Sequence, residues 1–343
     1  MDALDELSDL FESIPDTPMA MYFKVVHLAS LNMRYEKLAF NRKLEQHPYL
    51  LVRDIIRDQS ASFKWSIEML FTEKRNQTSK PEVPKLMEEK HHSLFNVIWP
   101  QYDKDSFRNY INRYKHRIEV NHLTDIIKGK RCLDLGCGNG NFCFALVEMG
   151  AEFAAGIDFG QESIVFANDF KINHPCGHRC EFKVNSVYQV DYPNEHFDFI
   201  VQNGVFHHLD KENDAIKEAV RLLKPGGYFW YYTDGEGGIG YDLWDRSVHL
   251  LRNVPVHFMN EIFRSMNMSD DKLVHLLDGM KATYRHTSWK EITTRLSTFG
   301  LGNFKRLTGG FETDFDLDVI EKDPYGKEKF GEGDLRILAQ LLK

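Results

Sequence analysis

Hydrophobic positions in the first third of the chain recur at helical spacing. In residues 1–77 they fall three or four positions apart, as Leu7 and Phe11 do, and prolines divide this stretch into several helices. Residues 78–86 are polar and contain two prolines, which is typical of a linker. Helical spacing returns in residues 87–129. The pattern therefore predicts a helical N-terminal region, a linker, and helices that lead into the rest of the chain.

The pattern changes at residue 130, where short apolar runs begin to alternate with helical stretches. Strands and helices in alternation predict a parallel sheet with helices on both faces. Residues 241–285 interrupt the alternation with helical spacing, so we expect a helical insertion there. The last residues, from about Asp334, are expected to end in a short helix. Residues 130–343 would thus form an α/β domain that carries a helical lid.

Composition and charge narrow the class of protein. The 343 residues include 43 basic and 51 acidic side chains, for a net charge of −8, which argues against DNA as a partner. No run of about 18 apolar residues occurs, so we expect no membrane-spanning helix. The acidic, amphipathic N-terminus is unlike a targeting peptide, and an odd number of cysteines, 5, is unlike a disulfide framework. We expect a cytoplasmic protein.

One segment carries a candidate ligand site. The apolar run CLDL leads into Gly136, Gly138 and Gly140, and a helix is expected to begin near Asn141. Glycines at such a junction let the backbone turn tightly and approach a ligand, which the N–H groups of the helix can then bind. Asp158 ends the next predicted strand, where a carboxylate can accept both ribose hydroxyls of a nucleoside.

The same segment distinguishes between two nucleoside ligands. NAD would suit a glycine-rich turn followed by an acid, but its fingerprint is G-x-G-x-x-G, whereas this chain has G-x-G-x-G. Asp134 lies two positions before the first glycine. A carboxylate there would repel a pyrophosphate and attract an ammonium group. The expected ligand is therefore a nucleoside that bears an amino acid.

These motifs and their order resemble those of the class I S-adenosylmethionine-dependent methyltransferases. LDLGCGNG resembles the first motif of that family, FAAGIDFG the second-strand motif, and EAVRLLKPGGYFWYY the helix, turn and fifth strand. The resemblance covers residues 131–232 and 287–311. It implies a Rossmann-like, seven-stranded, mostly parallel sheet with helices on both faces, and S-adenosyl-L-methionine as the cofactor.

The resemblance also assigns roles to single residues. Asp134 would lie near the amino group of the cofactor, Asp158 would hold the ribose, and Phe159 would lie against the adenine. The acid that usually follows the third strand is absent, so Ser186 or a backbone group must replace it. Arg117 is expected near the cofactor carboxylate, with a solvated basic face as the alternative. The residues expected to bind the cofactor are Asp134, Gly136, Gly138, Gly140, Asp158, Phe159, Ser186, Val187, Asn203 and Arg117.

A pair of histidines is the candidate for catalysis. Methyl transfer needs a positioned nucleophile and, for some acceptors, removal of a proton. His207 and His208 follow the fourth predicted strand, and histidine titrates near neutrality, so either could act as a general base. Support of the turn is the alternative role. Residues 174–180 contain four potential metal ligands in one short loop, but we expect a surface loop without metal.

The function expected from these features is methylation of a small-molecule metabolite at oxygen, nitrogen or carbon. A transferase that acts on tRNA or protein is the first alternative, with the N-terminal helices recognising the macromolecule. A non-catalytic protein that binds S-adenosylmethionine is the second. The amphipathic N-terminal helices could join two copies of the chain as a homodimer or cover the core of one.

Overall fold

The computed structural model describes residues 2–71, 94 and 104–342, so the predicted linker lies outside the described residues. Contacts between residues divide the chain into two compact units, and each unit is built from segments that are far apart in the sequence. The helical unit contains residues 1–86, 237–283 and 320–331, and the sheet unit contains residues 87–236, 284–319 and 332–343.

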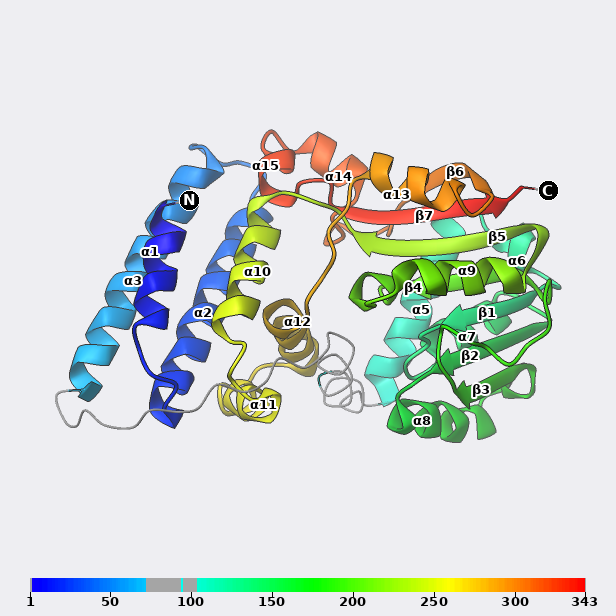
Figure 1. The fold of residues 1–343 in the computed structure, drawn as a ribbon, viewed down its shortest axis with the longest axis horizontal. Coiled ribbons are helices and arrows are strands. Elements are labelled where there is room, and N and C mark those ends of the chain that lie inside the picture. The colour runs from blue at the N-terminus through cyan, green and yellow to red at the C-terminus, as the bar shows by residue number, and fades with distance from the viewer. Residues whose placement is uncertain (1, 72–93, 95–103, 343) are drawn as a thin grey trace. The chain divides into compact units, whose positions relative to one another are not determined.

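The sheet unit holds a seven-stranded sheet in the order β3-β2-β1-β4-β5-β7-β6 (Figure 1). Strands β3, β2, β1, β4 and β5 run parallel, and β7 runs antiparallel to both of its neighbours. The order reverses beside β1, and the edge formed there by strand carboxyl ends is where ligands bind in such sheets. The expected fold class is therefore confirmed. The strands are β1 (Arg131–Leu135), β2 (Phe153–Asp158), β3 (Cys180–Val184), β4 (Phe197–Asn203), β5 (Leu223–Asp234), β6 (Leu301–Leu307) and β7 (Asp334–Leu341).

Helices cover both faces of this sheet. On one face, α5, α7 and α8 surround a core that includes the buried rings of Phe142 and Phe144. On the other face, α9 and α13 contribute Ile216 and Ile292 to a second core. The helices of this unit are α5 (Lys104–Val120), α6 (Thr124–Ile127), α7 (Asn141–Glu148), α8 (Gln161–Ile172), α9 (Glu212–Leu222) and α13 (Trp289–Ser297), with short 3₁₀ turns η2 (Gly177–Arg179) and η3 (Phe206–His208).

The last strand corrects a prediction. Residues from Asp334 were expected to form a short helix, but Asp334–Leu341 form β7, which lies between β5 and β6. Leu335 and Ile337 are fully buried in one core, and Leu338 is buried in the other. A strand covered on both faces has apolar residues without clean alternation, so its sequence resembles a buried helix. Pairing with two neighbouring strands decides the structure here.

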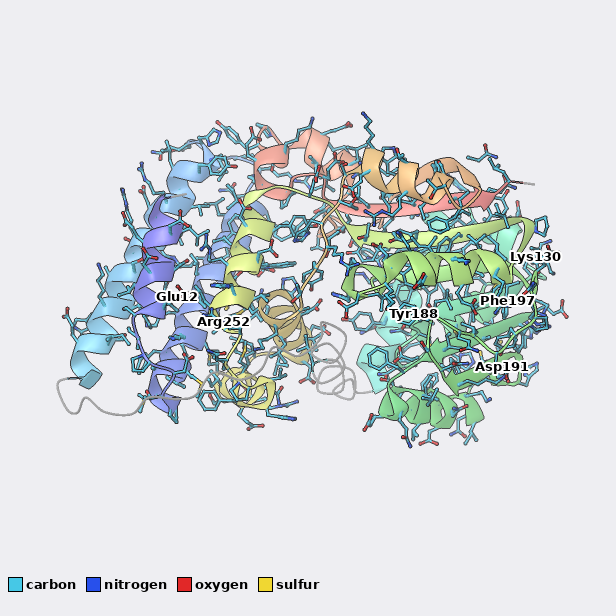
Figure 2. The ribbon with its side chains drawn as sticks, in the orientation of Figure 1. Glu12, Lys130, Tyr188, Asp191, Phe197 and Arg252 are labelled. Atoms are coloured by element: carbon cyan, nitrogen blue, oxygen red, sulfur yellow. The ribbon has the colours of Figure 1, made fainter. Side chains whose placement is uncertain are left out.

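In the helical unit the N-terminal helices pack against the insertion. Asn32 of α2 donates to the hydroxyl of Ser247 in α10 at 3.0 Å. Arg252, just after α10, pairs with Glu12 of α1 at 3.4 Å (Figure 2). Among the described residues, no helix is both long and apolar enough to cross a bilayer. The helices with residues in this unit are α1 (Asp2–Glu12), α2 (Pro18–Ala39), α3 (Pro48–Phe71), α10 (Ile239–Leu250), α11 (Val256–Ser265), α12 (Asp270–Lys281), α14 (Leu317–Lys322) and α15 (Gly326–Phe330).

A buried histidine lies between two of the N-terminal helices. Nδ1 of His27 in α2 is 2.6 Å from Nε2 of Gln59, and its Nε2 is 3.2 Å from the hydroxyl oxygen of Ser66. Both partners belong to α3, which also places the ring of Phe63 edge-on to the imidazole. Burial disfavours the charged imidazolium, so the pKa of His27 is lowered.

Candidate active site

The glycine-rich loop adopts a backbone that other residues rarely adopt. Gly136, Gly138 and Gly140 have φ values of 82°, 50° and 84°, in the left-handed region. Space is restricted as well, because a Cβ on Gly140 would lie 2.5 Å from the ring of Phe182. The loop leads directly into α7, so the first N–H groups of that helix lie at the ligand-binding edge of the sheet. The predicted tight turn between strand and helix is confirmed.

Asp158, at the end of β2, is bonded to the glycine loop. Its Oδ2 accepts a hydrogen bond from the N–H of Gly138 at 2.8 Å, and its Oδ1 accepts one from the N–H of Gly160 at 2.8 Å. The carboxylate thus holds the loop after β1 against the turn that begins α8. Each carboxylate oxygen has two lone pairs, and hydroxyl groups such as those of a ribose are suitable donors to it.

Asp134, in β1, is a buried carboxyl group that could bind a ligand. Its side chain is 3% exposed, and Oδ1 has no hydrogen-bond partner among the described residues. Burial, with the charge of Asp158 adding to it, raises the pKa of Asp134 to about 8. An ammonium group would satisfy the unpartnered oxygen and stabilise the ionised form. The site therefore fits a ligand that carries an amino acid, as the sequence predicts.

Asn203 connects the end of β4 to two aromatic side chains. Its Nδ2 donates to the hydroxyl of Tyr114 at 3.3 Å, and its Oδ1 accepts from Nε1 of Trp230 at 3.2 Å. Tyr114 also stacks on Phe142 of α7, with ring centroids 4.4 Å apart. Burial raises the pKa of the Tyr114 hydroxyl, and the charge of Asp134 adds to this effect. Tyr114 and Asn203 therefore belong to the surroundings of Asp134.

Arg117 is buried and paired, so the alternative of a solvated basic face does not describe it. It is 7% exposed, and its Nη2 lies 3.0 Å from Oδ1 of Asp314. Its Nε donates to the carbonyl of Gly309 at 3.3 Å. Burial and the nearby charge of Arg336 lower the pKa of Arg117. The guanidinium is thus bound to Asp314 in this structure, and a contact with the cofactor carboxylate stays a prediction.

The residues expected near the adenine lie on two neighbouring turns. Phe159 follows β2 and is 41% exposed. Ser186 is exposed after β3, and its hydroxyl accepts from the N–H of Tyr188 at 3.2 Å. Val187 is buried in the core on the α9 side of the sheet. Their contact with adenine stays a prediction.

His207 and His208 lie in η3, directly after β4, and both are buried. Their Nε2 atoms are 3.0 Å apart. Nδ1 of His207 lies 3.2 Å from the hydroxyl oxygen of Thr233 and accepts from the N–H of Asp234 at 3.3 Å. Sequence reasoning missed Thr233 and Asp234, although both end the strand that follows β4 along the chain and pairs with it.

A buried cluster of charges near the end of β5 was also missed. Arg336 of β7 pairs with Asp316 at 2.5 Å and with Asp334 at 2.8 Å, and its guanidinium lies over the ring of Tyr232 at 4.9 Å. The hydroxyl of Tyr232 lies 3.2 Å from Oδ1 of Asp234. The cluster lies at the start of β7, where a helix was predicted, so its proximity to β5 could not be anticipated.

The loop with potential metal ligands is engaged in other contacts. His174 bonds Oε1 of Glu148 at 2.9 Å, and Glu148 also accepts from Lys115 at 2.8 Å and pairs with Arg108. Burial alone would raise the pKa of Glu148, but these bonds outweigh it and lower that pKa to about 2. In the part of the chain that the structure describes, no three His, Cys, Asp or Glu side chains are arranged to hold a metal ion.

Comparison with known proteins finds a methyltransferase domain within this chain. Residues 126–284 match the family model described as "Methyltransferase domain". A demethylmenaquinone methyltransferase of Listeria welshimeri is 27% identical over 143 residues, which cover 41% of this chain and 60% of that protein. A fatty-acid O-methyltransferase of Mycolicibacterium smegmatis is 26% identical over 186 residues, which cover 49% of this chain and 61% of that protein.

The likeness to solved structures is weaker. One of them is a putative S-adenosyl-L-methionine-dependent methyltransferase from Methanococcus maripaludis, which is 17% identical, with a TM-score of 0.42 over 77% of this chain and 98% of that one. The chain spans about three fifths of the length of the curated relatives named above. Residues 126–284, a little under half of the chain, therefore match a methyltransferase domain, and the motifs around the glycine loop resemble those of the class I S-adenosylmethionine-dependent methyltransferases.

Proposed function

We propose that this protein binds S-adenosylmethionine at the carboxyl ends of β1, β2 and β4 and transfers its methyl group to a small molecule. The observation that carries the proposal is Asp134, a buried carboxyl group with an unpartnered oxygen and a raised pKa. A buried acid is costly unless it is paired. S-adenosylmethionine carries an ammonium group and a ribose on the same molecule. Asp158, at the end of the neighbouring strand β2, would bind the ribose.

Each residue of the site has a part in this proposal. The cofactor, when bound, supplies a methyl group activated by a sulfonium. Asp134 would hold its ammonium group, Asp158 its ribose hydroxyls, and the glycine loop would permit close approach of the backbone. Asn203, fixed between Tyr114 and Trp230, would border the methionine part. His207 and His208 would lie on the acceptor side, because they follow β4.

A small molecule is the proposed acceptor for two reasons. The relatives are named for acceptors of this size, demethylmenaquinone in one and a fatty acid in the other. The net charge of −8 is unfavourable for a polyanion such as tRNA. These reasons support a small molecule, methylated at oxygen, nitrogen or carbon, as the acceptor.

The test is formation of S-adenosylhomocysteine with a small panel of acceptors. The panel contains 2-hydroxy-1,4-naphthoquinone, 1-naphthol, hexadecanoate, hexadecanol and bulk tRNA, and mass spectrometry detects the methylated product. We expect product with at least one small molecule, and much less product from Asp158→Ala when S-adenosylmethionine is kept below saturation. Product from tRNA alone would favour the macromolecular alternative. Cofactor binding without any product above the protein-free background would favour a non-catalytic binding protein.

A further inference from the structure

The hydrogen bonds at Nδ1 of His207 determine which of its ring nitrogens carries the hydrogen. The backbone N–H of Asp234 can only donate, and it points at Nδ1 of His207 from 3.3 Å. Nδ1 is therefore a lone-pair nitrogen. The hydroxyl of Thr233, which lies 3.2 Å from the same nitrogen, must then donate to it as well. The end of β5 thus selects the tautomer of a histidine that follows β4.

The selected tautomer determines the state of the second ring. A neutral His207 with its lone pair on Nδ1 carries its hydrogen on Nε2. That atom lies 3.0 Å from Nε2 of His208, and the two rings are nearly perpendicular, at 80°. Nε2 of His207 therefore donates, Nε2 of His208 accepts, and the hydrogen of neutral His208 is on Nδ1. In the neutral pair, the lone-pair nitrogen of each histidine thus already accepts a hydrogen bond from within the protein.

A general base needs a lone pair that can reach the proton to be removed. We infer that the two histidines do not remove a proton from the methyl acceptor. Thr233 and the amide of Asp234 are positioning groups that fix the pair as neutral N–H donors, and the acceptor binds with its nucleophile already ionised. This inference rests on the proposed methyl transfer and names the acceptor class as an acidic hydroxyl, an enol or a carboxyl group.

Arg285 and Tyr284 also contact the segment that carries the pair. The N–H of Arg285 donates to the carbonyl of His207 at 3.1 Å, and its guanidinium bonds the carbonyl of Asp210 at 3.2 Å. The ring of Tyr284 contacts both imidazoles, with centroids 5.3 Å and 4.9 Å away. The guanidinium also lies 4.0 Å from the carboxylate of Asp210, so the charges of these two side chains balance.

Two further titratable groups near His207, Tyr232 and Asp234, belong to β5. Tyr232 places its ring 6.4 Å from that of His207, and its hydroxyl is 3.2 Å from the carboxylate of Asp234.

Methyl transfer to an ionised acceptor needs no general base. An ionised oxygen forms its bond to the methyl carbon with its own lone pair, while the sulfur keeps the electron pair of the broken S–C bond. No proton has to be moved.

The tautomers can be measured directly in the whole protein. Long-range ¹H–¹⁵N spectra of protein labelled in its histidines distinguish a protonated ring nitrogen from a lone-pair nitrogen, and His207→Gln and His208→Gln assign the signals. We expect Nε2–H in His207 and Nδ1–H in His208. A hydrogen on Nδ1 of His207 would overturn the inference.

Thr233 provides a matched pair of variants. Thr233→Val keeps the shape of the side chain without its hydroxyl. It should shift the ¹⁵N resonance of Nδ1 of His207, because that nitrogen loses one of its two donors and keeps the N–H of Asp234, whereas Thr233→Ser should preserve the wild-type spectrum. This comparison also identifies the signals of His207 if a glutamine variant fails to fold. Identical spectra for the valine variant and the wild type would show that Thr233 has no positioning role.

The acceptor class is tested by binding, separately from turnover. Calorimetry of the protein saturated with S-adenosylhomocysteine compares 2-hydroxy-1,4-naphthoquinone, which is ionised at pH 7, with neutral 1-naphthol, and hexadecanoate with hexadecanol. We expect the ionised member of at least one pair to bind about tenfold more tightly or better. No preference for either ionised member would overturn the acceptor class. Failure of the protein to bind S-adenosylhomocysteine at all would instead refute the proposed function.

Discussion

The buried carboxyl group of Asp134 predicts that cofactor binding releases a proton. Burial raises its pKa to about 8, so the free protein carries a neutral Asp134 at pH 6. An ammonium group needs the ionised form, and binding must therefore expel one proton. Affinity should rise about tenfold for each unit of pH between 5 and 7, which corresponds to about 1.4 kcal/mol per unit. An α-amino group titrates at about 7.7–8.0, so the ligand itself keeps its charge in this range.

Calorimetry with S-adenosylhomocysteine at pH 5, 6 and 7, in buffers of different ionisation enthalpy, gives both the affinity and the number of protons released. Asp134→Asn is the matched control, because it keeps the shape of the side chain and cannot titrate. The variant should bind more weakly at pH 7 and with an affinity that does not change with pH. Equal affinities and equal pH dependence in the variant and the wild type would refute the role assigned to Asp134.

Four further results are expected. Asp134→Asn should raise the stability of the free protein at pH 8, as measured by thermal unfolding. The folded pKa of Asp134 is raised, so the stability of the wild-type protein falls as pH rises from about 4 to about 8, and asparagine removes this loss. Asp158→Ala should weaken S-adenosylmethionine binding by about 1–3 kcal/mol, through the loss of ribose bonds and of the support of the glycine loop, and unchanged calorimetric affinity in a folded variant would contradict the assignment. Because the pKa of His27 is lowered in the folded protein, the contribution of this histidine to folding stability is complete above about pH 6.5 and declines below it. Urea unfolding of His27→Gln should therefore show a weaker pH dependence than that of the wild type between pH 5 and 7.5. Glu148→Gln should destabilise the protein by about 1–3 kcal/mol at pH 7, and the difference from the wild type should disappear as pH falls below about 4.5 toward 2. As a control, Asp58→Asn at an exposed ion pair should change the free energy of unfolding by about 0.5 kcal/mol or less.

The sheet and its glycine loop could be predicted because their signals are local. The run into Gly136, Gly138 and Gly140 combines an apolar strand, a turn that needs glycine and a helix start within a few residues. Asp158 follows from the same reasoning one strand later. Such features depend on neighbours in the chain, so hydrophobic spacing and turn chemistry are sufficient to find them.

The features that were missed depend on contacts between distant segments. Thr233 matters only because β5 pairs with β4 and brings it to His207. Arg336 and its acidic partners require the tail to be a strand, which its own sequence does not reveal. The joining of the N-terminal helices with the insertion likewise depends on pairs such as Asn32 and Ser247. Long-range packing overrides local preference at these places.

The most direct test of the proposed function is titration calorimetry of the purified protein with S-adenosylmethionine, S-adenosylhomocysteine and NAD. The site described here predicts micromolar binding of the first two and no binding of NAD. Absence of binding to both sulfur compounds in folded protein, or binding of NAD instead, would contradict the assignment of Asp134 and Asp158 to an amino-acid-bearing nucleoside.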